Sequence, residues 1–222
     1  MSELRILSGK YKGTKLLSPD LKTTHPMGSR EKLALFNMLT PYLADATVLD
    51  YFAGSGALGL EALSRGAASV TFVETNPKAR KVIRENCKRC IANEGKSFFA
   101  DVLPANEKMY IPDDPDGFAR RAVPPAVQRM TAPWDAEGRR PTFSSETGAA
   151  KKVFTSFAKQ YDLIISDPPY DDYQVPDYAS LLLPGGILAL SHPKDFDPAT
   201  ITGLTLLKTN HYAACHISLF AK

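Results

Sequence analysis

The chain has 222 residues, of which 44% are hydrophobic and 23% are charged, and these proportions are typical of one globular domain with an appendage. It contains no apolar run long enough for a spanning helix and no signal-peptide core at its start, which favours a cytoplasmic protein without a membrane segment. Three cysteines are too few for a disulfide framework, which fits a reducing compartment. Of the net charge of +3, residues 1–32 contribute +4, from seven basic and three acidic side chains. This distribution indicates a nucleic-acid-binding surface or a solvated lysine-rich one.

The first predicted elements form an N-terminal extension. Residues 4–7 and 14–17 are short strand-like runs on either side of a glycine-bearing loop, and they predict a hairpin. Ser29 is expected to cap a helix that extends to about Leu43, because Leu35, Phe36 and Leu39 fall on one helical face.

From residue 47 onward, predicted strands and helices alternate. Strands are expected at residues 47–50, 69–74, 97–100, 161–166 and 186–191, and helices at residues 58–65 and 77–93. This alternation predicts an α/β fold with a doubly wound, mainly parallel sheet. The last two runs, residues 204–208 and 213–220, have no helix between them and are expected to pair antiparallel.

A long segment interrupts the alternation. Residues 104–150 hold seven of the 17 prolines and show no sustained apolar period, so we expect an irregular insertion. It contains Trp134 among five arginines, which are Arg120, Arg121, Arg129, Arg139 and Arg140. Arginines interleaved with aromatic residues suit contact with RNA, and a solvated loop is the alternative.

A glycine-rich turn follows the strand at residues 47–50. Gly54, Gly56 and Gly59 satisfy the dinucleotide-binding pattern, which is also compatible with a nicotinamide-dependent dehydrogenase. Asp50 lies four residues before Gly54, where its carboxylate can attract the ammonium of an amino-acid moiety. S-adenosylmethionine has such a moiety and NAD does not. With Phe52 between them, these residues read Asp-x-Phe-x-Gly-x-Gly, which resembles motif I of class I methyltransferases.

Two further acidic residues follow predicted strands. Glu74 comes 18 residues after Gly56, at a spacing where a carboxylate can hold both ribose hydroxyls of a nucleoside cofactor. Asp101 is expected at the end of the next strand, where it could accept from an adenine amino group with the Val102 amide nearby.

The tetrapeptide Asp167-Pro168-Pro169-Tyr170 follows an apolar strand. An aromatic amine is a poor nucleophile, because its lone pair is delocalised into the ring. The Asp167 carboxylate and the Pro168 carbonyl can accept from its hydrogens, and two prolines hold that carbonyl rigidly. Tyr170 can stack on a flipped base. The tetrapeptide therefore indicates methylation of an exocyclic amino nitrogen.

Together these motifs resemble the bacterial 16S ribosomal RNA guanine-N2 methyltransferase family. The resemblance covers residues 4–103 and 151–222, and its motifs are at residues 5–13, 30–37, 48–66, 72–74 and 161–170. It implies a class I methyltransferase fold with a seven-stranded sheet, an RNA-contacting extension at residues 1–45 and a methyltransferase domain at residues 46–222. The implied cofactor is S-adenosylmethionine, without a metal, and the implied substrate is ribosomal RNA or the assembling small subunit. The expected RNA contacts are Arg5, Lys10, Lys12, Lys15 and Arg30, and we expect a monomer.

Other functions remain open at this stage. The same tetrapeptide occurs in enzymes that methylate adenine N6, cytosine N4 or a glutamine amide. A non-catalytic RNA-binding assembly factor could also have this fold. The chain also departs from the family before its first helix, where residues 25–30 read His-Pro-Met-Gly-Ser-Arg in place of Arg-Pro-Thr, a polar residue and Asp-Arg. We interpret five remaining residues as structural, namely the pair Cys87 and Cys90, then His211, Cys215 and His216.

Overall fold

The computed structural model describes residues 4–19, 27–91, 100–103, 160–170, 175–213 and 215–222. The strands are β1 (Thr47–Tyr51), β2 (Ser69–Val73), β3 (Ala100–Leu103), β4 (Tyr161–Ser166), β5 (Leu182–His192), β6 (Thr205–His211) and β7 (His216–Ala221). The helices are α1 (Ser29–Leu39), α2 (Ala57–Ser64), α3 (Pro77–Ile91) and α4 (Tyr178–Leu181), with 3-10 turns η1 (Thr40–Tyr42) and η5 (Pro198–Thr200). The predicted insertion at residues 104–150 lies outside the described residues.

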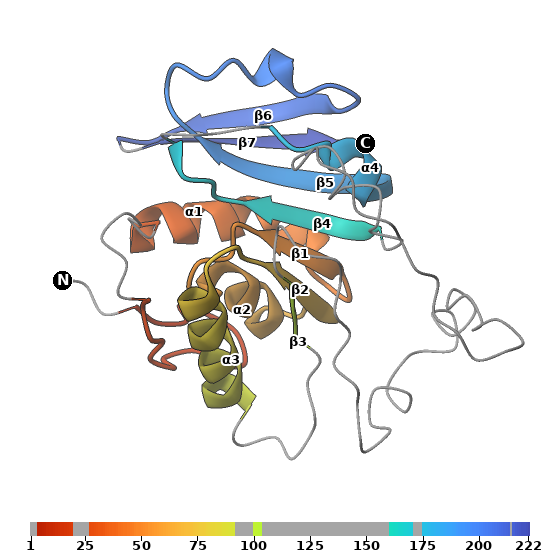
Figure 1. Cartoon of the computed structure of the whole chain (residues 1–222). Coiled ribbons are helices and arrows are strands. Elements are labelled where there is room, and N and C mark those ends of the chain that lie inside the picture. Colours follow the sequence, from red (N-terminus) through yellow and green to blue (C-terminus); the bar gives the residue numbers. More distant parts are fainter. Residues whose placement is uncertain (1–3, 20–26, 92–99, 104–159, 171–174, 214) are drawn as a thin grey trace, which may run out of the picture.

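In this part of the chain seven strands form one sheet, in the order β3-β2-β1-β4-β5-β7-β6 (Figure 1). β1, β2, β3, β4 and β5 pair in parallel, whereas β7 pairs antiparallel with both β5 and β6. The predicted mainly parallel sheet with antiparallel C-terminal strands is therefore confirmed. None of the described helices has the length and apolar character needed to cross a membrane.

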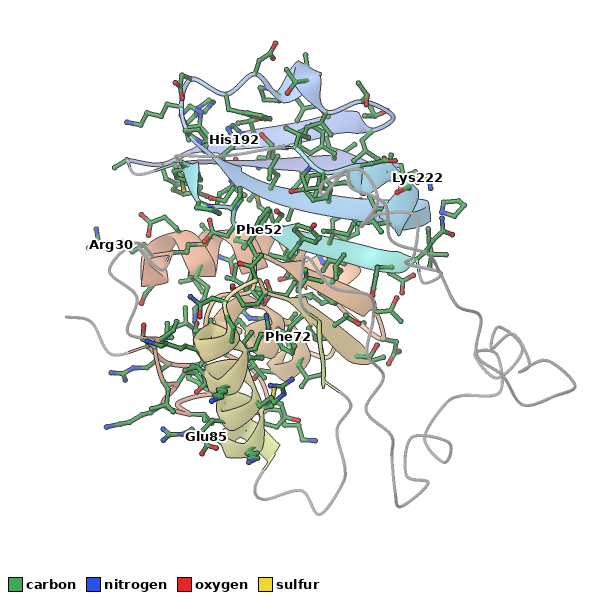
Figure 2. All side chains as sticks on the ribbon, in the orientation of Figure 1. Arg30, Phe52, Phe72, Glu85, His192 and Lys222 are labelled. Carbon is green, nitrogen blue, oxygen red and sulfur yellow. The ribbon has the colours of Figure 1, made fainter. Side chains whose placement is uncertain are left out.

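Side chains alternate between the two faces of the sheet, and each face has its own hydrophobic cluster. On one face Val48 packs with Leu35 of α1, Leu60 of α2 and Ile83 of α3, so these three helices cover the same side. On the other face Leu49 packs with Tyr178 of α4. Phe72 of β2 is fully buried beneath α3, whereas Glu85 on the outer side of α3 is exposed (Figure 2).

The first helix differs from the prediction at both ends. It begins at Ser29 itself, after Gly28, and no side chain caps it, so the expected Ser29 cap is wrong. The α-helix ends at Leu39 and continues as the turn η1, which contains Pro41. A proline lacks the amide hydrogen that the next α-helical bond would need, which explains why the helix ends before residue 43.

The third strand ends later than predicted. It is predicted at residues 97–100, whereas β3 is described at Ala100–Leu103. The two phenylalanines before Ala100 gave the apolar signal, but residues 97–99 lie outside the described part of the chain. Leu103 pairs with Val73, so the carboxyl end of β3 is level with that of β2. Asp101 therefore lies within the strand, two positions before its end.

The predicted N-terminal hairpin is present and is closed by backbone hydrogen bonds. Ile6 N–H donates to the Thr14 carbonyl at 3.1 Å, and Leu16 N–H donates to the Leu4 carbonyl at 2.8 Å. Ile6 and Leu16 are buried in the cluster that contains α1 and α2. The hairpin therefore shares the hydrophobic core of the sheet.

Buried polar groups on α2 hold the hairpin. The fully buried Glu61 accepts from the amides of Leu7, at 2.7 Å, and Ser8, at 3.0 Å. Its charge is matched by Arg65 at 2.8 Å and by the buried Lys32 of α1 at 3.5 Å. Three segments that carried the family resemblance, from the hairpin, α1 and α2, thus meet at one carboxylate.

Candidate active site

The order of the strands defines one edge of the sheet as the candidate site. From β1 the chain proceeds outward through β2 to β3, and then returns to place β4 on the other side of β1. Ligands of doubly wound sheets bind at the carboxyl ends of the strands where the order reverses, which here is between β1 and β4. Because Tyr51 pairs with Ser166, Asp167 follows β4 beside the turn that follows β1.

Asp50 is buried near the end of β1 and faces α2. Its carboxylate accepts the Gly59 amide at 2.8 Å, and only 1% of the residue is exposed. Burial raises the pKa of Asp50 to about 8, the Gly59 hydrogen bond opposes this shift, and the charges of Asp167 and Glu74 add to it. The carboxyl groups of Asp167 and Glu74 therefore both lie close enough at this edge to act on Asp50.

The turn after β1 is tight and strained. Phe52 has a φ of 66°, which is unusual for a bulky residue, and it places Gly54 beside Glu74. Gly54 donates its amide to Glu74 at 2.7 Å, and the Asn76 amide donates to the second carboxylate oxygen at 2.8 Å. Gly59 has no room for a side chain, because a Cβ there would lie 2.4 Å from the Phe72 ring. The glycine pattern thus allows both the turn and the close packing of α2 on β2.

The tetrapeptide after β4 lies on the α1 side of the sheet edge. Asp167 is half-buried, and burial raises its pKa to about 6. The nearby Ser191 side chain has the smaller, opposite effect and lowers the pKa of Asp167. Pro168 is buried and Pro169 is exposed. Tyr170 is 38% exposed and shares a hydrogen bond of 2.5 Å with the Ser191 hydroxyl. A partly exposed ring beside a carboxylate is an arrangement that can receive a planar base.

The remaining predicted cofactor residues are less closely placed. Asp101 and Val102 lie on β3, opposite Thr71 and Phe72, and their side chains are outside the described part of the structure. Their roles stay predictions. By contrast, the other predicted cofactor residues all lie around the turn between β1 and α2 or at the end of β2 beside it. These residues are Asp50, Phe52, Gly54, Gly56 and Glu74.

The predicted RNA contacts are spread along the molecule. Arg30 is exposed in the first turn of α1 (Figure 2). The neighbouring Glu31 is close enough to influence Cys215, which lies beside Tyr170. Lys10 lies at the C-terminal end of α2, away from the glycine turn, since its amide donates to the Ser64 carbonyl at 2.7 Å. The remaining predicted contacts are also exposed, and these are Arg5, Lys12 and Lys15.

Two residues of the site were not predicted as functional. Ser191, at the end of β5, contacts both Asp167 and Tyr170, and Cys215 lies against Ser191 and Tyr170. Ser191 could have been found as a polar residue at the carboxyl end of an apolar strand, whereas Cys215 carries no such signal.

Comparison with solved structures identifies the fold. The Escherichia coli protein yhhF, named as a provisional methyltransferase, superimposes with a TM-score of 0.67 at 22% identity over 100% of this chain and 98% of its own. A Thermus thermophilus 16S rRNA N2 G1207 methyltransferase, solved with AdoMet and guanosine, gives a TM-score of 0.52 at 18% identity over 90% of this chain and 44% of its own. The fold is that of a class I methyltransferase.

Sequence comparisons agree with this assignment. Residues 4–111 match the family described as Conserved hypothetical protein 95. Ribosomal RNA small subunit methyltransferase D of Escherichia coli is 45% identical over 84 residues, which are 38% of this chain and 42% of that protein. YlbH of Bacillus subtilis, a provisional rRNA methyltransferase by name, is 26% identical over 99% of both chains. The predicted resemblance to small-subunit rRNA methyltransferases is confirmed. The 84 matched residues cover less than half of the length of the Escherichia coli methyltransferase D.

Proposed function

We propose that this chain transfers a methyl group from S-adenosylmethionine to the exocyclic N2 amino group of a guanine in small-subunit ribosomal RNA. The observation that carries this proposal is the group formed by Asp50, Glu74 and Asp167 around the glycine turn at the carboxyl edge of the sheet. The names of the relatives that match the chain support the choice of ribosomal RNA.

The charges of the site fit this cofactor. Burial raises the pKa of Asp50, and the charges of Asp167 and Glu74 raise it further; a cation bound nearby would favour the ionised form of Asp50. S-adenosylmethionine carries an ammonium and a sulfonium, and Asp50 would face the ammonium. Glu74 keeps further lone pairs for ribose hydroxyls, because each carboxylate oxygen accepts more than one hydrogen bond and each has one backbone amide donor.

The reaction needs positioning more than it needs an acid or a base. When bound, S-adenosylmethionine supplies a methyl group on a cationic sulfur. The guanine amino nitrogen forms the new N–C bond with its lone pair while the C–S bond breaks and its electrons stay on sulfur. Asp167 accepts a hydrogen bond from the amino group and takes up the proton, directly or through water, after the transfer. Tyr170 provides a face against which the base can stack.

Transfer of tritium from labelled S-adenosylmethionine to purified small-subunit RNA tests the proposal, and mass mapping of the product locates the methyl group. We expect label on a guanine N2, and we expect Asp167→Ala to lower the rate by about 100-fold or more with a much smaller change in cofactor affinity. Asp162→Ala, which removes an exposed carboxylate that accepts from Thr47 near the start of β4, is the matched control and should transfer label at the wild-type rate.

The alternatives give different results in the same assay. Label on adenine N6, cytosine N4 or a protein amide would keep the chemistry and change the substrate. Calorimetric binding of NAD in place of S-adenosylmethionine would indicate a dehydrogenase. Tight cofactor binding without transfer to any RNA would contradict the proposed activity and favour a non-catalytic assembly factor.

A further inference from the structure

Asn86 is a buried amide of α3 that joins two segments that are distant in sequence. It is 0% exposed, and its side chain forms three hydrogen bonds, all to the backbone of other elements. In the hairpin, the Leu17 amide donates to Oδ1 at 2.7 Å, and Nδ2 donates to the Leu17 carbonyl at 2.9 Å. Nδ2 also donates to the Ser55 carbonyl of the glycine turn at 2.9 Å. One side chain thus connects the hairpin to the turn that is proposed to bind the cofactor.

The bonding pattern fixes the orientation of the Asn86 amide. A carboxamide has two N–H donors on its nitrogen and only acceptor sites on its oxygen. If the group were turned over, its oxygen would face the carbonyls of Leu17 and Ser55, and its nitrogen would face the Leu17 N–H. Both N–H groups are therefore in use, one for each segment.

On the side of the turn, Asn86 sets the orientation of one peptide plane. The Ser55 carbonyl accepts from Asn86. The N–H of the same peptide group, on Gly56, donates to the Ala53 carbonyl at 2.7 Å. α3 also supports the turn one helical turn earlier, because a Cβ on Gly56 would lie 3.2 Å from the Ile83 side chain. The Ser55–Gly56 peptide is therefore held at both ends.

On the side of the hairpin, α3 contacts the run at residues 14–17. Arg89, one turn after Asn86, donates to the Lys15 carbonyl at 3.5 Å, so this run lies along the helix (Figure 1). Leu17 is 36% exposed, so its backbone bonds with Asn86, rather than burial of its side chain, tie this end of the run to α3. A phosphate bound at Lys15, one of the predicted RNA contacts, would favour the same position of the run.

We propose that Asn86 is a positioning residue that couples RNA binding on the hairpin to S-adenosylmethionine binding at the glycine turn, so that each ligand strengthens the binding of the other. This inference rests on the proposed function, which assigns the two ligands to these two segments. RNA favours the state in which the run lies against α3, and in this state the two Leu17 bonds hold the amide in the orientation that the Ser55 bond needs. The cofactor favours the same state from the turn. Because such coupling is reciprocal, its size is the same in both directions.

Calorimetric titration with S-adenosylhomocysteine, with and without an unmodified transcript of small-subunit RNA, measures this coupling without turnover. In the wild type, we expect RNA to lower the dissociation constant by about tenfold, as is common for coupled sites. Asn86→Ala removes all three bonds and should reduce this factor to less than about twofold. Leu17→Pro removes the amide hydrogen that Asn86 accepts and leaves the bond to Ser55. It should reduce the factor by about half or more, with cofactor affinity in the absence of RNA close to that of the wild type.

Ser64→Ala is the matched control for a loss of hairpin contacts. Ser64 is 3% exposed, and its hydroxyl accepts from the Tyr11 amide and donates to the Ser8 carbonyl, so the substitution removes bonds to the hairpin and none to the turn. It should lower the free energy of unfolding and keep the tenfold factor.

The outcomes separate the coupling from the proposed function. A wild-type factor of one, a factor that stays at the wild-type value in both Asn86→Ala and Leu17→Pro, or an equal loss in Ser64→Ala would overturn the coupling while methyl transfer stands. A coupled wild-type protein that binds both ligands and transfers no methyl group would instead contradict the proposed function alone.

Discussion

Asp50 shows how one residue can contribute both to the fold and to the proposed site. Its position in β1 directs its side chain toward α2, where the Gly59 amide is its hydrogen-bond donor. The same burial that aligns this bond raises its pKa to about 8, far above the value of about 4 expected in an unfolded chain. The folded protein therefore binds the Asp50 proton more tightly than the unfolded chain does.

This difference predicts a pH-dependent effect of Asp50→Asn on stability. Between about pH 4 and pH 8 the folded state holds the proton and the unfolded state releases it, so wild-type stability decreases as the pH rises. Asparagine keeps an oxygen for the Gly59 amide and does not titrate. In urea titrations, the free energy of unfolding of Asp50→Asn should increase relative to that of the wild type from pH 5 to pH 8, because only the wild type loses stability over this range. A difference that is constant with pH would mean that Asp50 is not buried as described.

At the scale of elements, the hairpin is held by contact with α2 as well as by the backbone hydrogen bonds between its own strands. The Gly9 backbone is so close to α2 that a Cβ there would lie 1.8 Å from the Ser64 carbonyl oxygen. Gly13, in the same loop, has nothing within 4 Å of such an atom. Both residues have positive φ, of 80° and 87°, so they differ in packing and not in backbone conformation.

This contrast gives a matched pair of substitutions. Gly13→Ala should lower the free energy of unfolding by about 1–2 kcal/mol, the cost of a left-handed conformation for a residue with a Cβ. Gly9→Ala has the same cost and also forces the loop away from Ser64, so it should lose roughly 2 kcal/mol more. Urea denaturation measures both. Equal losses in the two variants would show that the loop does not need its contact with Ser64.

The elements that could be predicted from sequence are those with strong local signals. The glycine turn, the helix that ends before Gly66 and the strand before Asp167 all follow from local pattern and were confirmed. The Ser29 cap is wrong, because the residue at the N-cap position is Gly28, and β3 extends to Leu103, three residues beyond its predicted end. Ser191 and Glu61 were missed as organising residues because their partners lie on other elements, which only the folded sheet brings together.

At the scale of the whole molecule, the basic residues of the N-terminal extension do not surround the active site. Arg30 is exposed at the start of α1, next to Glu31, whose charge acts on Cys215. The loop with Lys10 and Lys12 contacts Ser64 at the far end of α2, and eight helical residues span about 12 Å. An RNA that reaches both would follow the hairpin away from the reacting base, so these lysines are suited to bind phosphates rather than the target nucleotide.

The salt dependence of RNA binding tests this path. Each phosphate contact that is lost should reduce the slope of log affinity against log salt by about 0.7–0.9, so Lys10→Ala combined with Lys12→Ala should flatten it by about twice that amount. The pair Lys208→Ala and Lys222→Ala removes the same charge from exposed positions on β6 and after β7, toward the opposite edge of the sheet, and should leave the slope unchanged. Methylation of free guanosine should be the same in both double variants, because neither pair lies at the reacting edge. Equal slopes in the two variants would mean that the hairpin loop does not contact RNA.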